Sequence, residues 1–229
     1  MIKGAYSFGS IKVDLSKQFN ISGKIKFEDI YKKTGIKTIY RASEEENSLT
    51  LAVDASKKAL KLVDEEVESL IFVSQSHVSS IPSSGNILHE MLNLKKECFV
   101  LDITQGCSGF PYAMITAINL IKNKEFNNCL IVCSETYTKH INKSDRSTAP
   151  IFSDAASAFF INKKNLPSIL STFSYTDGSG GKNLCLKEDE KGKKNLFMHG
   201  TNVFTFTAEK VPFATKKILE KANLKLEEI

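Results

Sequence analysis

The sequence predicts an α/β protein with a mixed or parallel sheet that helices cover on both faces. Strand-like and helix-like segments alternate along the chain, which is the pattern of βαβ units. The segments 70–73 and 130–133 are continuously apolar, as expected for central strands that are buried on both faces. With 229 residues the chain is long enough for one large domain or two modest ones.

The order of the elements follows from local patterns. Strand signals lie at residues 2–8, 69–74, 98–103, 128–134, 151–153 and 156–161. Apolar residues at helical spacing predict helices over 48–63, 85–92 and 109–121, the first of them capped by Asn47 or Ser48. Residues 163–167 are expected to link two halves. Beyond them we expect a strand over 169–175, a mobile hairpin or loop over 177–195, and a helix over about 204–222.

Composition excludes several classes of function. The net charge of +5 comes from scattered lysines, whereas a nucleic-acid surface needs clustered basic residues. No apolar run is long enough to span a membrane and the N-terminus lacks a signal-peptide pattern, so we expect a cytoplasmic protein. The five cysteines are odd in number and form no CxxC pair. This pattern favours reduced thiols over a disulfide framework or a metal site.

A Gly-Cys-Ser-Gly bend at residues 106–109 carries the clearest chemical signal. It joins a strand-like run to an apolar helical segment. A cysteine at a helix N-terminus lies near unpaired backbone N–H groups and the positive end of the helix dipole, and both stabilise a thiolate. The glycines permit a tight turn and close approach of a substrate. Cys107 is therefore either a nucleophile for a thioester or similar carbonyl, or a small buried apolar side chain.

Several short segments match, in order, the motifs of one enzyme family. They are Lys-Thr-Gly-Ile at 33–36, Asp-Ile-Thr-Gln-Gly-Cys-Ser-Gly-Phe at 102–110, Ser-Glu-Thr at 134–136, Asp-Arg-Ser-Thr at 145–148, Phe-Ser-Asp-Ala-Ala-Ser-Ala at 152–158 and Met-His-Gly at 198–200. Through them the chain resembles the ketoacyl-acyl-carrier-protein synthase III group of thiolase-like condensing enzymes. This resemblance favours Cys107 as a nucleophile.

The resemblance implies a thiolase-like fold and a two-step reaction without a metal or cofactor. Cys107 would take an acyl group from acyl-CoA or an acyl-carrier-protein thioester. A malonyl thioester would then lose carbon dioxide, and its carbanion would attack the acyl-enzyme, as in fatty acid biosynthesis. Acyl carrier protein is the implied protein partner, and a homodimer is the implied assembly. The resemblance places five further side chains at the substrate: Lys33, Arg146, Ile81, Phe152 and Phe204.

Several positions depart from the family pattern. Lys33 stands where relatives carry Arg, which keeps the charge but loses the planar fork. The chain has no Trp, although relatives that use coenzyme A often clamp the adenine between a Trp and the loop arginine. Ile81 stands where many relatives carry a Phe that shapes the acyl pocket of the dimer partner. We therefore expect a branched or longer primer, or one delivered on a carrier protein. For Phe152 and Phe204, pocket lining and ordinary core packing both stay open.

Relatives also use a His and an Asn that donate hydrogen bonds to the developing enolate. None of the four histidines, His77, His89, His140 and His199, lies in a matching segment, so structural or surface roles are expected for them. We expect residues 1–165 to form the N-terminal half and residues 166–229 the beginning of an incomplete C-terminal half. Such a chain would accept an acyl group but not complete a condensation.

Two alternatives stay open. The chain could be a related acyltransferase of glycan or secondary lipid synthesis, or an acyltransferase to a hydroxyl or amine. It could also be a catalytically incompetent fragment that serves as a dimerising module. We expect dimerisation through the sheet edge and the helix that follow Cys107. The resemblance implies that the strand 128–134 and its neighbours lie near the two-fold axis, with the loop 79–82 reaching into the partner's pocket.

Overall fold

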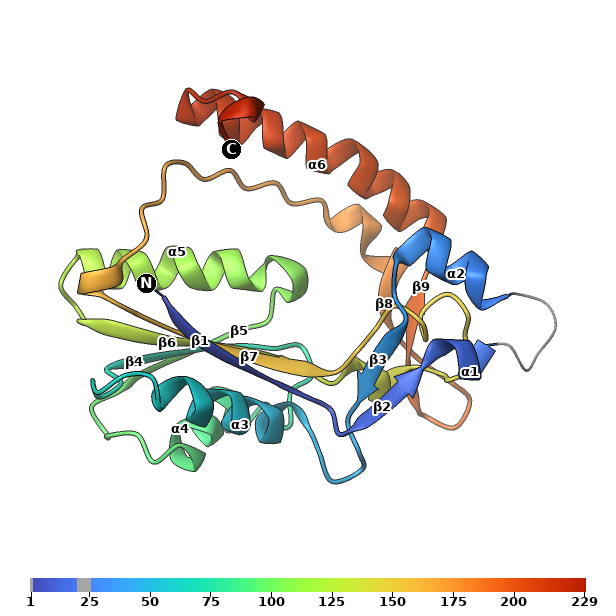
Figure 1. The fold of residues 1–229 in the computed structure, drawn as a ribbon, viewed down its shortest axis with the longest axis horizontal. Coiled ribbons are helices and arrows are strands. Elements are labelled where there is room, and N and C mark those ends of the chain that lie inside the picture. Colours follow the sequence, from blue (N-terminus) through green and yellow to red (C-terminus); the bar gives the residue numbers. More distant parts are fainter. Residues whose placement is uncertain (1, 20–25) are drawn as a thin grey trace. The chain divides into compact units, whose positions relative to one another are not determined.

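The computed structural model describes residues 2–19 and 26–229. Met1 and residues 20–25, which belong to the predicted first half, lie outside the described residues. The chain forms two compact units, Met1–Lys139 with Pro150–Pro167, and His140–Ala149 with Ser168–Ile229. The first unit is a mixed five-stranded sheet with helices on both faces (Figure 1), which confirms the predicted α/β class. The division into two thiolase-like halves stays a prediction.

The sheet has the strand order β1-β7-β6-β4-β5. Strand β4 (Ser69–Val73) lies parallel to β5 (Phe99–Ile103) and to β6 (Asn128–Glu135). Strand β7 (Ala155–Asn162) is antiparallel to β6 and to the edge strand β1 (Lys3–Phe8). All of β4 is buried, as its continuous apolar sequence predicts. Because β4, β5 and β6 run the same way, their carboxyl ends meet at one end of the sheet.

Helices α3 (Ser48–Leu60) and α4 (Ser84–Met91) cover one face of this sheet, and α5 (Gly109–Lys122) covers the other (Figure 1). Of the two predicted caps of α3, Asn47 and Ser48, the structure has Asn47, whose Oδ1 accepts hydrogen bonds of 2.9 and 3.0 Å from two amides of the first turn. The core between α3 and the sheet consists of apolar side chains from both, among them Leu51, Ala52, Leu70, Phe72, Leu130 and Phe160.

A smaller antiparallel pair, β2 (Ile11–Asp14) with β3 (Thr38–Arg41), also belongs to the first unit. Two short helices accompany it, α1 (Leu15–Phe19) and α2 (Phe27–Thr34). None of these four elements is predicted from the sequence, because each has at most eight residues, too few to show a clear apolar period. Helix α2 ends at Gly35, whose φ of +70° lies in the left-handed region that favours glycine.

Two predicted strands are wrong. Residues 151–153 form no strand; instead the Ser153 hydroxyl accepts the Tyr40 N–H at 2.8 Å and donates to the Tyr40 carbonyl at 3.1 Å. A side chain thus takes the place of the backbone ladder. Residues 169–175 are also not a strand. Their rings Phe173 and Tyr175 instead pack edge-on against Phe213, at centroid distances of 5.7 and 6.1 Å.

The second unit holds a hairpin and a long helix. Strands β8 (Leu184–Glu188) and β9 (Lys194–Met198) pair as a hairpin that begins within the predicted segment 177–195 and extends three residues beyond it. Helix α6 (Gly200–Ala222) begins one turn earlier than predicted, and His199 Nδ1 accepts an amide N–H of its first turn at 3.3 Å. In residues 2–19 and 26–229 no helix combines the length and apolarity needed to cross a membrane.

Candidate active site

Cys107 lies in a 3₁₀ turn, Gly106–Ser108, between the carboxyl end of β5 and the first residue of α5. The cysteine is exposed. Ser108 occupies the N-cap position of α5, but its hydroxyl donates to the Gln105 carbonyl at 3.1 Å and does not cap the helix. No side chain therefore caps the N-terminus of α5, and the positive end of the helix dipole favours an anion at Cys107.

The two glycines of the bend have different roles. Gly106 has a φ of +55°, which an L side chain rarely adopts, and a Cβ there would lie 2.5 Å from Gln75 Oε1. Gly109 is buried, and a Cβ there would collide with Val73 Cγ1 of β4. Gly106 therefore makes the turn, as predicted. Gly109 lets α5 approach the sheet, rather than opening a path for a substrate.

A polar network that the sequence did not predict lies against this turn. Gln75, directly after β4, donates from Nε2 to the Thr104 carbonyl at 3.0 Å. Its Oε1 accepts the hydroxyl of Tyr137, which lies just beyond β6. The Tyr137 ring meets Phe152 edge-on, with centroids 5.7 Å apart. The network thus joins the predicted substrate residue Phe152 to the end of the sheet that carries Cys107.

Glu135, the last residue of β6, holds the network in place through its carboxylate. Its carboxylate accepts the Gln75 N–H at 2.8 Å, the Ser76 N–H at 3.0 Å and the Ser76 hydroxyl at 2.6 Å. Burial raises the pKa of Glu135, against the lowering effect of these hydrogen bonds and of His77. Burial also raises the pKa of Tyr137, and the nearby charges of Glu135 and Cys107 act in the same direction. The sequence carries no local pattern that marks Gln75 or Tyr137, although each lies two residues beyond a buried parallel strand.

Three other thiols lie in strands or beside them and are held neutral by burial. Burial raises the pKa of Cys98 to about 11, of Cys133 to about 11 and of Cys129 to about 12. A thiol with so high a pKa is a poor nucleophile near neutral pH. The geometry thus favours the exposed Cys107 over these three as the reactive cysteine.

The histidines have contacts of the structural kind that the sequence predicts. His89 and His140 each contact a backbone carbonyl, at 2.9 and 3.3 Å. His199 accepts an amide hydrogen bond at the start of α6, and His77 is exposed in the loop after β4. Across the described ranges, no three His, Cys, Asp or Glu side chains gather so that they could hold a metal ion.

The remaining predicted substrate residues are divided between the two units. In the first unit, Lys33 is exposed in the last turn of α2, and Ile81, in the loop before α4, is 91% exposed. Arg146 and Phe204 belong to the second unit. Arg146 lies in a turn that Asp145 stabilises by accepting the Ser147 N–H at 2.9 Å. Phe204, on α6, is 72% exposed.

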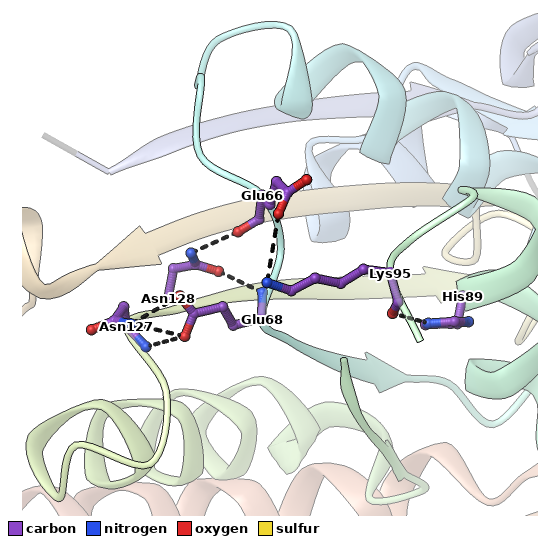
Figure 2. A network of polar contacts seen from close by, with 6 residues as sticks. All are labelled: Glu66, Glu68, His89, Lys95, Asn127 and Asn128. Carbon is purple, nitrogen blue, oxygen red and sulfur yellow. Dashed lines mark hydrogen bonds and ion pairs between the residues drawn. The ribbon is translucent and has the colours of Figure 1, made fainter. Parts of the chain in front are cut away.

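A second polar cluster lies at the amino ends of β4 and β6, the opposite end of these strands from Cys107 (Figure 2). The buried Asn128 accepts the Glu68 N–H at 2.9 Å and donates to the Glu66 carbonyl at 2.8 Å. Asn127 donates its backbone N–H to the Glu68 carboxylate at 2.7 Å, and Lys95 lies 3.6 Å from the Glu66 carboxylate. Because these polar groups serve as hydrogen-bond or ion-pair partners for one another, the cluster has a structural role: it holds together the amino ends of β4 and β6.

Comparisons with known proteins agree with this architecture. The family model of 3-oxoacyl-[acyl-carrier-protein (ACP)] synthase III matches residues 101–178. Beta-ketoacyl-[acyl-carrier-protein] synthase III of Staphylococcus haemolyticus (strain JCSC1435) is 34% identical, over 100% of this chain and 73% of the relative. The crystal structure of 3-oxoacyl-[acyl-carrier-protein] synthase III from Aquifex aeolicus VF5 superposes with a TM-score of 0.86 at 26% identity, over 99% of this chain and 73% of that one. The priming beta-ketosynthase of the R1128 polyketide pathway shares the fold, with a TM-score of 0.85 at 24% identity over 99% of this chain and 71% of its own.

Proposed function

Because the chain belongs to the 3-oxoacyl-[acyl-carrier-protein] synthase III family of condensing enzymes, we propose that Cys107 accepts an acyl group from a thioester. The thiolate attacks the carbonyl carbon, the new bond to Sγ forms, and the bond to the donor sulfur breaks and releases a free thiol. The observation that carries the proposal is the exposed Cys107 at the uncapped N-terminus of α5. There, backbone N–H groups can stabilise both the thiolate and the oxyanion.

The family reaction continues with a malonyl thioester in fatty acid biosynthesis. Loss of carbon dioxide leaves a carbanion, which forms a carbon–carbon bond to the acyl carbonyl as the bond to Cys107 Sγ breaks. The test of this second step supplies acyl-CoA and malonyl carrier protein and follows labelled carbon dioxide and ketoacyl product.

Substrate choice follows from the departures in the sequence. Lys33 and Arg146 are proposed to bind the phosphates of coenzyme A or of the carrier-protein prosthetic group. Phe152, Phe204 and the Ile81 of a second copy are proposed to line the acyl pocket. Since Ile is smaller than the Phe of many relatives, the primer is proposed to be branched or longer than acetyl. We place the enzyme in the cytoplasm, with its five cysteines unpaired.

The homodimer is proposed to form along β5. Strand β6 lies inside the sheet between β7 and β4, so residues 128–134 offer no free edge, and the predicted location of the contact needs this correction. Strand β5 is an edge of the sheet and pairs with β4. A second copy that adds to this edge would cover its unpaired backbone groups. The exposed Ile81 loop, which precedes α4, would then be available to the partner.

A panel of acyl donors tests the proposed function. The chain is incubated with straight and branched acyl-CoA thioesters and with the same acyl groups on carrier protein, and the covalently held acyl group is counted. Transfer from at least one thioester, abolished in Cys107→Ser and retained in the matched control Cys185→Ser, is expected. Acyl transfer that persists in Cys107→Ser would reject the proposal.

A further inference from the structure

The geometry points to Gln75 and Tyr137 as positioning residues of the Cys107 turn. This inference rests on the proposed role of Cys107 as acyl acceptor, and adds to it two side chains that act through the backbone of residues 104–107. They orient the nucleophile and the adjacent amides toward the acyl carbonyl. Neither is required to touch the acyl group.

The turn needs support from outside. Thr104, Gln105 and Cys107 are all exposed. Gly106 adopts a left-handed conformation, and glycine has many alternatives to the conformation seen here. Within the turn, the Ser108 hydroxyl contacts the Gln105 carbonyl at 3.1 Å and the Gly109 N–H contacts the Gly106 carbonyl. These local bonds reach back to Gln105 and Gly106, and neither of them holds Thr104, on the side of β5.

The Gln75 amide supplies the missing contact on that side. Its Nε2 donates to the Thr104 carbonyl at 3.0 Å. Its Oε1 and Cδ lie against Gly106, 2.5 and 3.0 Å from the position that a Cβ would take. The Tyr137 hydroxyl donates to the same Oε1. Because the Thr104 carbonyl can only accept a hydrogen bond, Nε2 must face it, and Oε1 then faces the Tyr137 hydroxyl.

Both side chains are themselves anchored. The backbone N–H of Gln75 donates to Glu135 Oε1 at 2.8 Å, and the Thr136 N–H donates to the Ser76 hydroxyl at 3.0 Å. Phe152 holds the Tyr137 ring edge-on. The Gln75 amide thus links the segments that follow the carboxyl ends of β4, β5 and β6 by hydrogen bonds to Thr104 and Tyr137. Because both ends of the Gln75 amide are held, it restricts the backbone before Cys107 and so the directions of the Cys107 Sγ and N–H.

Three substitutions separate the parts of this device. Gln75→Met keeps the length of the side chain and removes both hydrogen bonds. Gln75→Glu keeps the acceptor for Tyr137 but removes the donor to Thr104. Tyr137→Phe removes the phenol donor alone and leaves the ring contact with Phe152. Tyr6→Phe is the matched control, because Tyr6 is 62% exposed on the edge strand β1.

The experiment compares two rates at Cys107: acyl transfer from a thioester and alkylation by iodoacetamide, which needs no oxyanion stabilisation. Gln75→Met is expected to slow acyl transfer by about 10- to 100-fold, the cost of a misplaced reacting group, with little change in alkylation. Gln75→Glu should slow acyl transfer by a similar factor and Tyr137→Phe by a smaller one, while Tyr6→Phe should transfer the acyl group at the wild-type rate. Unchanged acyl transfer in Gln75→Met, or an equal fall in both rates with a smaller folded fraction, would overturn the proposal.

Hydrogen exchange separates this inference from the function on which it rests. Absence of any acyl group on wild-type Cys107 would reject the proposed function. The amides of residues 104–109 should exchange faster in Gln75→Met than in the wild type, whether or not Cys107 is acylated, while those of β6 stay unchanged. Equal exchange in the turn would reject the positioning role by itself.

Discussion

Iodoacetamide should alkylate the exposed Cys107 before the three buried or half-buried thiols that lie in or beside strands. Burial raises the pKa of Cys98 and Cys133 from an ordinary value of 9.0 to about 11, and of Cys129 to about 12. Each pKa unit is a factor of ten in the thiolate fraction. A thiol shifted this far therefore presents about 100- to 1000-fold less thiolate near neutral pH than a thiol with the ordinary pKa. Cys107 is exposed and lies at the positive end of α5.

The assay is a time course of alkylation, read by peptide mass mapping, on the wild type and on Cys107→Ser. A fast phase confined to the Cys107 peptide is expected in the wild type, and its loss in the variant. The slow phase of the strand thiols should grow as the pH rises, because their pKa values lie above the usual assay range. If Cys98, Cys129 or Cys133 reacts as fast as Cys107, the argument from burial is refuted.

Three further predictions concern the Cys107 turn, the polar cluster at Asn128 and the pH dependence of stability. Gly106→Ala should cost about 1–3 kcal/mol of folding free energy and slow acyl transfer, whereas Gly192→Ala, also at positive φ but in open space, should leave transfer unchanged in the same assay. Asn128→Ala should lower the free energy of unfolding in urea by about 1–3 kcal/mol, because the partly buried Glu68 N–H and Glu66 carbonyl lose their partners, and exposed Asn127→Ala should cost less. The folded state holds the Cys129 thiol neutral, so the contribution of this thiol to the free energy of unfolding is complete below about pH 9. Above pH 9 the contribution falls by about 1.4 kcal/mol per pH unit until the pH approaches 12. Urea titrations at pH 8 and pH 10 should show a lower free energy of unfolding at pH 10, and Cys129→Ser should reduce the difference.

The sequence predicts best the elements whose environment is uniform along their length. Strands β4 and β6 are apolar throughout and buried in the centre of the sheet, so composition alone identifies them. Helix α3 combines an apolar face with a capping residue, Asn47, that the structure confirms. Residues 169–175 have strand-like composition but no neighbouring strand; their aromatic side chains pack on α6 instead. Local propensity cannot distinguish these two outcomes, because the difference lies in the tertiary partner.

The site is predicted in the same uneven way. The Gly-Cys-Ser-Gly bend identifies Cys107 because a left-handed turn before a helix leaves a local signature. Gln75 and Tyr137 leave none: each is one polar residue after a strand, and its importance depends on which strands are neighbours in space. Ser153 shows the same limit, since its hydroxyl replaces a backbone partner of β3 at a position that composition marks as strand.

The most direct measurement of the central claim is the location of the acyl group after reaction with a thioester. The chain is incubated with an acyl-CoA or acyl-carrier-protein donor, then digested and mapped by mass spectrometry. The account predicts one acyl group per chain, on the peptide that contains Cys107. An acyl group on Cys98, Cys129, Cys133 or Cys185 with Cys107 unmodified, or a folded chain that takes no acyl group from any donor, would contradict it.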